Sequence, residues 1–291
     1  MKIRSNNGSN KALSADAKSR AAEAQRWAIN DKQKIGDDMN STIERPNYGN
    51  WVSRKLILIP FVLFIIFCGL IWIQIYFLVP AIILFVISIY FGFSRYLFSS
   101  KGKDVQTKVH DLIIGNLEWN GEGRVLDIGC GSGALPITLA KKYQNAQIHG
   151  IDYWGKQWEY SQTICEKNAE LENVLNRIEF KKASAADLPF DDQSFDVVLS
   201  NLVFHNIGSV KDKSELIKEA LRVLKKGGKF VFQDLFLWSQ VYGKPEKLIE
   251  TIQSWGIKNV KMINTNEMPF IPLMLKLPFM LGKMSIIIGE K

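Results

Sequence analysis

A glycine-rich turn that follows an apolar run is the most informative feature of the sequence. Residues 125–133 read Val-Leu-Asp-Ile-Gly-Cys-Gly-Ser-Gly, and the next apolar run ends in an acid, Asp152. Glycines let a backbone approach a ligand closely, and the N-terminus of a following helix offers unpaired N–H groups to an anionic group. A carboxylate at the end of the second run can accept hydrogen bonds from ribose hydroxyls. Together these features predict a nucleoside-binding crevice at the carboxyl ends of the strands.

The acid within the first run indicates which nucleoside compound fits. Gly129, Gly131 and Ala134 also satisfy the dinucleotide pattern G-x-G-x-x-G/A, so glycine spacing alone leaves the ligand open. A pyrophosphate would be repelled by the carboxylate of Asp127, whereas the ammonium group of an amino acid would be attracted. S-adenosylmethionine carries such an ammonium group together with a ribose, and Asp127 therefore favours it.

Four motifs in order give the region from about residue 103 to residue 291 a resemblance to a known family. It resembles the class I S-adenosylmethionine-dependent methyltransferases, particularly the broad small-molecule group called type 11. The motifs are residues 125–133, Asp152, residues 186–190 (Ala-Asp-Leu-Pro-Phe) leading to 194–198 (Ser-Phe-Asp-Val-Val), and residues 224–230 (Leu-Lys-Lys-Gly-Gly-Lys-Phe). The resemblance implies a Rossmann-like α/β fold with a mainly parallel seven-stranded sheet, an antiparallel last strand, and S-adenosylmethionine as the cofactor.

The resemblance also implies which residues bind the cofactor. These are Asp127 and Gly129 at its methionine end, Gly131 and Gly133 in the turn, Asp152 at the ribose, Tyr153 against the adenine, Asp187 preceded by Ala186 at the adenine amino group, and Asn201 facing the methyl-transfer pocket. Each of three also has a structural alternative: helix capping for Asp127, a loop carboxylate for Asp152, and ordinary packing for Tyr153. Asp191 and Asp192 lie close enough in sequence to be confused with Asp187.

Two residues are candidates for a catalytic role in methyl transfer. Transfer of the methyl group from a sulfonium requires that the acceptor be aligned with the methyl group and that water be excluded. A base is needed only if the acceptor must first lose a proton. His205 has a side chain suited to that task near neutral pH, and Asn201 lies four residues before it. A structural role for His205 is equally compatible with the sequence, because the chain has His205-Asn206 where the family often has a histidine pair.

Elements of alternating type are expected to position these residues. Strand-like runs cover residues 124–128, 147–151, 177–181, 195–200, 229–233, 259–263 and 284–289, with helical stretches at 135–143, 155–171, 210–225 and 245–255. Alternation of strands and helices predicts a parallel sheet covered on both faces. The last two strands have no clear helix between them, so we expect the final strand to run antiparallel.

A long uncharged stretch precedes this region and predicts a membrane hairpin. Residues 56–93 carry no charge and would form one helix of about 57 Å, against a hydrocarbon core of about 30 Å. Two spans fit better, at about 56–76 and 80–98 with a turn at 77–79. Arg54, Lys55, Arg95, Lys101 and Lys103 flank the stretch, and positive flanks at both ends place both on the cytoplasmic side.

Composition indicates which kinds of site and partner to expect. The chain has 291 residues, 47% of them hydrophobic, a net charge of +8 and only three cysteines, which are far apart. A disulfide framework or a metal site is therefore not expected. The positive charge fits a membrane surface, because much of it lies in the N-terminal tail and beside the hairpin. We expect no nucleic-acid partner. Residues 200–203 read Ser-Asn-Leu-Val and lack the Asn/Asp-Pro-Pro-aromatic motif of enzymes that methylate amino groups of nucleic acids.

The sequence thus predicts three parts: a polar flexible tail (1–53) with a short helix within 13–34, a transmembrane hairpin (54–98) and a methyltransferase domain (99–291). We expect a two-pass membrane protein, with both termini and the catalytic domain cytoplasmic, that methylates a hydrophobic or membrane-resident small molecule. The apolar stretch 268–281 is either a flap that admits this acceptor or a loop packed on the sheet. Alternatives are a non-catalytic S-adenosylmethionine-binding scaffold or sensor, or a nicotinamide-dependent oxidoreductase. The methylated atom and the oligomeric state stay open.

Overall fold

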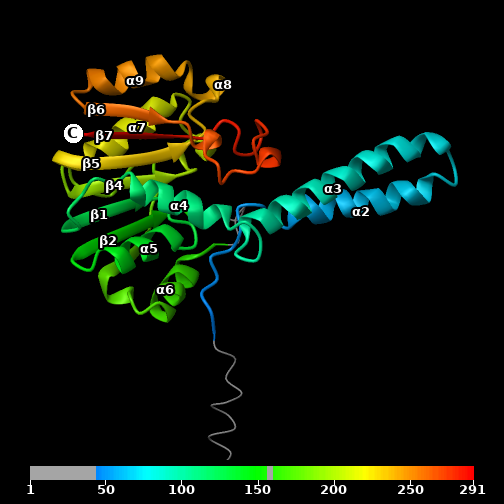
Figure 1. The fold of residues 1–291 in the computed structure, drawn as a ribbon, viewed down its shortest axis with the longest axis horizontal. Helices are drawn as coiled ribbons and strands as arrows, with labels where there is room; N and C mark the ends of the chain where they lie inside the picture. Colours follow the sequence, from blue (N-terminus) through cyan, green and yellow to red (C-terminus); the bar gives the residue numbers. More distant parts are fainter. Residues whose placement is uncertain (1–43, 156–159) are drawn as a thin grey trace, which may run out of the picture. The chain divides into compact units, whose positions relative to one another are not determined.

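The computed structural model describes residues 44–155 and 160–291 (Figure 1). The helix expected within residues 13–34 lies outside the described residues. From Pro46 to Lys291 the chain forms one compact unit.

A seven-stranded sheet in the order β3-β2-β1-β4-β5-β7-β6 forms the centre of this unit. The strands are β1 Gly123–Ile128, β2 Ala146–Asp152, β3 Ile178–Lys182, β4 Phe195–Asn201, β5 Leu224–Asp234, β6 Lys258–Ile263 and β7 Ser285–Glu290. The first five run parallel, and β7 pairs antiparallel with both β5 and β6. The seven strands and the antiparallel last strand agree with the sequence expectation, whereas the insertion of β7 between β5 and β6 was not expected.

Helices cover both faces of the sheet (Figure 1). They are α4 Val105–Gly115, α5 Ala134–Lys142, α6 Gln162–Leu171, α7 Lys213–Arg222, α8 Ser239–Tyr242 and α9 Pro245–Ser254. Apolar side chains of α4, α5 and α6 belong to one core cluster, and those of α7 and α9 belong to a second. Polar caps fix where helices begin: the side chain of Ser161 accepts from the Ile164 N–H before α6, and Asp212 accepts from the Ser214 N–H before α7.

An antiparallel helix pair, α2 Lys55–Leu70 and α3 Leu78–Phe98, precedes the sheet. The turn between the two lies at 71–74 and is followed by the short helix η1 Ile75–Phe77, so the expectation of a turn at 77–79 was wrong. Pro80 is the third residue of α3, where its missing N–H costs no helical hydrogen bond, and the helix can therefore begin before it.

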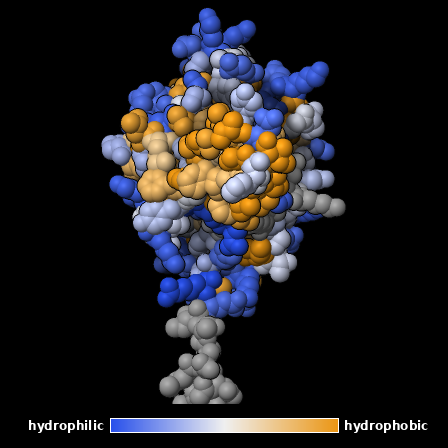
Figure 2. Space-filling view, turned by 90° about the vertical axis from the view of Figure 1, so that its right-hand side faces the viewer, coloured by the Kyte–Doolittle hydropathy of each residue, from blue (hydrophilic) through white to orange (hydrophobic). Residues whose placement is uncertain are grey.

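Apolar side chains cover the outer surface of this pair. Figure 2 shows hydrophobic residues gathered at the centre of one face and hydrophilic residues around them. Most large apolar side chains of α2 and α3 are exposed, and Trp72 and Tyr76 beside the turn are 93% and 81% exposed. Within the described residues, one helix, Ile75–Phe98, is long and apolar enough to cross a membrane by length and composition; Lys55–Leu70 is apolar but shorter.

Candidate functional site

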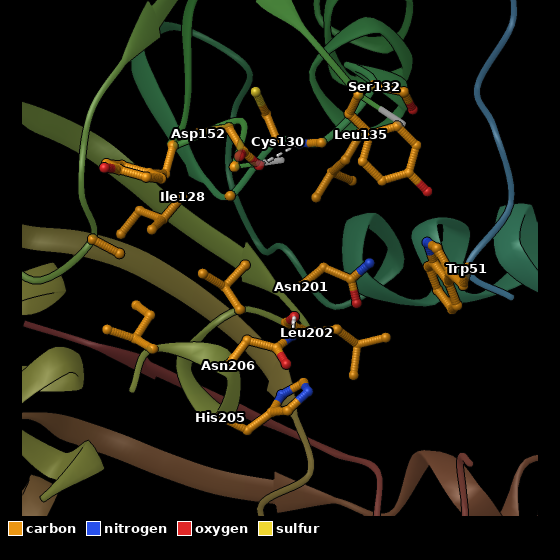
Figure 3. A pocket seen from close by; sticks show the side chains of 18 of the residues that line it. Trp51, Ile128, Cys130, Ser132, Leu135, Asp152, Asn201, Leu202, His205 and Asn206 are labelled. Atoms are coloured by element: carbon orange, nitrogen blue, oxygen red, sulfur yellow. Dashed lines mark hydrogen bonds between the residues drawn. The ribbon is translucent and has the colours of Figure 1, made fainter. Parts of the chain in front are cut away.

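A pocket of about 1030 Å³ opens at the carboxyl ends of β1, β2 and β4. Its walls come from the loops after these strands, where ligands bind in open α/β sheets. Figure 3 shows Asp152 and Cys130 at one end of this pocket and His205 and Asn206 at the other, with Asn201 between them. The volume is at the upper end of the usual range of about 300–1,000 Å³ for small-molecule sites.

The glycine-rich turn after β1 forms one wall in a conformation that requires glycine. Gly129 has φ +76°, and a Cβ atom there would lie 2.1 Å from Cγ2 of Val203. The N–H groups of Gly129 and Cys130 both donate to the carbonyl of Ile151, at 2.7 and 2.9 Å. These bonds hold the turn against the end of β2, and so the loop is ordered by the protein itself.

Asp152 lies beside this turn at the end of β2. Its Oδ2 accepts from the Gly131 N–H at 2.9 Å, and its Oδ1 accepts from the Trp154 N–H at 2.7 Å. Each carboxylate oxygen can accept a further hydrogen bond, which suits a ribose diol. Tyr153 also lines the pocket and is 66% exposed, with Nζ of Lys182 5.3 Å from the centre of its ring.

Asp127 lies at the floor of the pocket and is 1% exposed. Its Oδ1 has no hydrogen-bond partner within the described part of the chain. Burial, with a contribution from the nearby Asp152, raises the pKa of Asp127 to about 8. A buried carboxyl group with an unused oxygen fits the ammonium group at the methionine end of S-adenosylmethionine, since a cation would favour its ionised form.

The pocket wall on the side expected for adenine is formed by residues that precede the expected pair, Ala186 and Asp187, in the sequence. Ala183, Ser184 and Ala185 line the pocket, but Ala186 and Asp187 do not. The Asp187 N–H donates to the carbonyl of Ser184 at 3.3 Å in a tight turn, and the Asp187 residue is exposed. The structure therefore brings Ser184, rather than Asp187, to the wall of the pocket.

The opposite end of the pocket carries the two catalytic candidates. His205, in the short helix Phe204–Asn206 after β4, places Nδ1 2.5 Å from Oδ1 of Asp234, and its N–H donates to Oδ2 at 3.3 Å. Asn201 lines the pocket, and its Oδ1 accepts from Nε2 of Gln233 at 3.1 Å. Sequence reasoning missed Asp234, although an acid at the end of a strand next to β4 was a usable signal.

Apolar side chains from outside the sheet complete the pocket. Those from the segment before α2 and from the helix pair are Trp51, Val52, Leu56, Phe91 and Phe98, and those from the apolar C-terminal stretch are Phe279, Met280 and Leu281. A single pocket thus extends from the glycine-rich turn to an apolar wall, which gives room for a polar cofactor and an apolar second molecule.

The comparison with protein families shows which kind of domain this part of the chain resembles. Residues 126–232 match the family model described as "Methyltransferase domain". These residues are similar to methyltransferase domains. The match includes the second half of β1, all of β2, β3 and β4 and most of β5, and with them the glycine-rich turn, Asp152, Asn201 and His205.

Curated relatives of this chain carry the names of methyltransferases. The 27-O-demethylrifamycin SV methyltransferase of Amycolatopsis mediterranei is 33% identical over 165 residues, which are 57% of this chain and 57% of that protein. The demethylmenaquinone methyltransferase of Lactobacillus johnsonii is 35% identical over 105 residues, 36% of this chain and 40% of that protein. The chain therefore spans about half the length of the curated relatives it matches.

A solved structure agrees with the fold. The geranyl diphosphate C-methyltransferase from Streptomyces coelicolor A3(2) superposes with a TM-score of 0.52 and 13% identity, over 66% of this chain and 81% of that one. The expected enzyme class, that of a methyltransferase, agrees with the family match and with the names of these relatives.

Proposed function

We propose that this protein is a membrane-anchored S-adenosylmethionine-dependent methyltransferase whose acceptor is a small hydrophobic or membrane-resident molecule. The observation that carries the proposal is the extent of the pocket. Its lining joins the glycine-rich turn and Asp152, on the cofactor side, to Leu56, Phe91 and Phe279 on the apolar side.

Length, exposure and flanking charge support the membrane hairpin. At about 1.5 Å per residue, α3 is about 31 Å long, close to a hydrocarbon core of about 30 Å. The outward side chains of α2 and α3 are apolar, and water would not stabilise that surface. Cationic residues at both ends of the hairpin favour two crossings with both ends cytoplasmic.

The apolar C-terminal stretch supports an acceptor that arrives from the membrane. The Tyr90 hydroxyl on α3 donates to the carbonyl of Met274 at 2.9 Å, and the Tyr90 and Phe279 ring centres are 5.9 Å apart. Leu273 and Phe279 are 84% and 65% exposed. An apolar surface that contacts a membrane helix and also lines the pocket offers an amphiphile a path in which its tail stays out of water.

Names of the relatives support a small-molecule acceptor. Two relatives are named for methylation of demethylmenaquinone and of 27-O-demethylrifamycin SV. A ring compound with an apolar tail or body is therefore the acceptor class we propose.

The chain's own residues suit a reaction in which the acceptor loses a proton. When bound, S-adenosylmethionine supplies a methyl group on a sulfonium, which is already a good leaving group. The apolar wall excludes water, and Asn201 offers its amide group to orient the acceptor. Asp234 holds Nδ1 of His205, so Nε2 is the ring nitrogen that can take the acceptor's proton.

Transfer of a labelled methyl group tests the proposal. Full-length protein in phospholipid nanodiscs would be incubated with methyl-tritiated S-adenosylmethionine and a membrane lipid extract, and label in the organic phase would be counted. We expect transfer by the native chain and by Asp191→Asn, which changes an exposed carboxylate outside the pocket, but not by Asp152→Asn. Cofactor binding without transfer would instead indicate the scaffold or sensor.

A further inference from the structure

The segment immediately before α2, residues 47–52, packs on the methyltransferase domain; we call it the strap. It reads Asn-Tyr-Gly-Asn-Trp-Val. Asn168 on α6 holds its first residue in both directions: the Asn47 N–H donates to Oδ1 of Asn168 at 2.8 Å, and Nδ2 of Asn168 donates to the Asn47 carbonyl at 2.9 Å. The Tyr48 hydroxyl donates to Glu172 at 3.1 Å. The strap is thus fixed to the helix that follows β2.

Hydrogen bonds also join the strap to the glycine-rich turn. The Ser132 hydroxyl donates to the Tyr48 carbonyl at 2.8 Å, and Nδ2 of Asn168 donates to the Ser132 carbonyl at 3.0 Å. Asn168 is 2% exposed and therefore forms a buried link between the strap and the turn. Displacement of the strap would leave buried polar groups of the turn without partners, which costs free energy.

Gly49 allows the strap to approach the pocket wall. Its φ is +66°, and a Cβ atom there would lie 2.5 Å from Cε1 of Tyr160. Tyr160 lines the pocket, and its hydroxyl donates to the Asn50 carbonyl at 3.2 Å. A side chain at position 49 would force the strap and the ring of Tyr160 apart.

The far end of the strap joins the pocket to the hairpin. Trp51 and Val52 line the pocket, and the Trp51 ring lies 5.5 Å from that of Phe98 at the end of α3. Nδ2 of Asn50 donates to the Arg95 carbonyl at 3.0 Å, and the Arg95 guanidinium donates to the Val52 carbonyl. Figure 3 shows Trp51 on one side of the pocket, away from Asp152.

We propose that the strap is part of the cofactor-binding site, and that it holds the glycine-rich turn in its binding conformation and closes the pocket beside it. This inference rests on S-adenosylmethionine being the ligand of the pocket. Since the strap leads directly into α2, the site is complete only in a chain that includes the hairpin and the residues before it. The affinity for the cofactor thus depends on a segment outside residues 126–232.

Titration of S-adenosylhomocysteine into the full chain in detergent micelles tests this. Gly49→Ala displaces the strap from outside the pocket lining, and we expect it to weaken binding about tenfold through the smaller fraction of chains with a docked strap. Gly256→Ala is the matched control, because Gly256 also has a positive φ (+83°), but a Cβ atom there would meet no neighbouring side chain or backbone within 4 Å. Asn50→Ala, which removes the bond to Arg95, should also weaken binding.

The results distinguish failure of the assigned cofactor from failure of the role given to the strap. Failure of the native chain to bind S-adenosylhomocysteine would contradict the assigned cofactor itself. Binding by the native chain that Asp152→Asn weakens, but that Gly49→Ala and Asn50→Ala leave equal to Gly256→Ala, would overturn the role of the strap alone.

Hydrogen exchange of the native chain gives a second test that needs no variant. Coupling between two sites is reciprocal, so a ligand that prefers the docked strap must also stabilise it. We expect S-adenosylhomocysteine to slow amide exchange in residues 47–52 several-fold. Protection of the glycine-rich turn with unchanged exchange in the strap would overturn the inference.

Discussion

Nδ1 of His205 lies 2.5 Å from Oδ1 of Asp234, a carboxylate with no solvent exposure that also accepts from the Leu235 N–H at 2.6 Å. Asp234 is the last residue of β5, and His205 lies in the short helix that follows the neighbouring strand β4. A buried acid on Nδ1 fixes the orientation and the tautomer of the imidazole, which leaves Nε2 as the proton acceptor. This pairing is what makes His205 a base rather than a polar lining residue in our account.

Replacement of Asp234 should reduce turnover without loss of cofactor binding. In Asp234→Asn the side-chain amide can donate to Nδ1, which moves the ring proton to Nε2 and blocks its use as a base. We expect methyl transfer to the lipid extract to fall about 100-fold, within the usual contribution of general base catalysis. Affinity for S-adenosylhomocysteine should stay within about twofold. Asp192→Asn, on the exposed acid that pairs with Arg222, is the control, and equal rates in the two variants would contradict the role of His205.

Cofactor affinity should rise with pH because of Asp127. Its pKa of about 8 means that the carboxyl is protonated at neutral pH in the free protein, and an ammonium group in contact with it would favour ionisation. Binding at pH 7 should therefore release a proton, and affinity should increase by up to about tenfold per pH unit from about pH 6 to 8. Calorimetric titration in buffers of different ionisation enthalpy measures this release. Proton release that persists in Asp127→Asn would assign it to another group.

The same raised pKa makes the cofactor-free protein less stable as the pH rises, whereas it makes cofactor binding stronger. Between about pH 4 and 8 the folded chain holds a proton on Asp127 that the unfolded chain has lost, so this group lowers the free energy of unfolding as the pH rises. In our proposal, pairing of the cofactor's ammonium group with the ionised form offsets this loss of stability.

Charged residues in the middle of α3 should abolish membrane anchoring. Ile82 and Val86 are 52% and 57% exposed, and one arginine at the centre of a membrane helix costs about 2.5–3.5 kcal/mol. We expect Ile82→Arg/Val86→Arg to move the chain from the carbonate-washed membrane fraction into the soluble or aggregated fraction. The double leucine variant at the same positions should stay in the membrane. Retention of the arginine variant would argue against the hairpin as a membrane anchor.

Phe279 should affect the acceptor and not the cofactor. It lines the pocket beside Tyr90, so Phe279→Ala removes apolar surface from the path of an amphiphile. With increasing lipid extract as the acceptor source, we expect the apparent KM to rise about 3- to 10-fold, since burial of part of an aromatic ring is worth about 1 kcal/mol or more. Leu175→Ala, which removes an exposed apolar side chain outside both the pocket lining and the apolar C-terminal stretch, is the control. An unchanged KM would place the acceptor path elsewhere.

Local sequence patterns predicted most of the sheet. Val125–Ile128 of β1 and Val197–Ser200 of β4 are buried, and the short apolar runs within these stretches are visible in the sequence. The early start of β5 at Leu224 was missed, because the sequence predicted a helical stretch up to residue 225 and a strand only from residue 229. The place of β7 between β5 and β6 depends on long-range pairing that no local pattern encodes.

The site was predictable where it depends on one stretch of chain. Asp127, Gly129 and Asp152 lie at the ends of consecutive strands, so their spacing is sufficient to bring them together. Asp234 joins His205 only through the order of the strands, and Trp51 joins the pocket from a segment that the sequence assigned to a flexible tail. Asp187 is only two residues from the pocket wall, but the turn from Ser184 to Asp187 leaves it exposed.

The most direct test of the account is a calorimetric titration of the full chain in micelles with S-adenosylmethionine, S-adenosylhomocysteine and NADH, alongside Asp152→Asn. The account predicts that the first two ligands bind, that Asp152→Asn weakens both at least about tenfold by removing ribose acceptors and a bond to the glycine-rich turn, and that NADH does not bind. Binding of NADH alone would contradict the account, because the pocket would then bind a dinucleotide instead of an S-adenosyl compound.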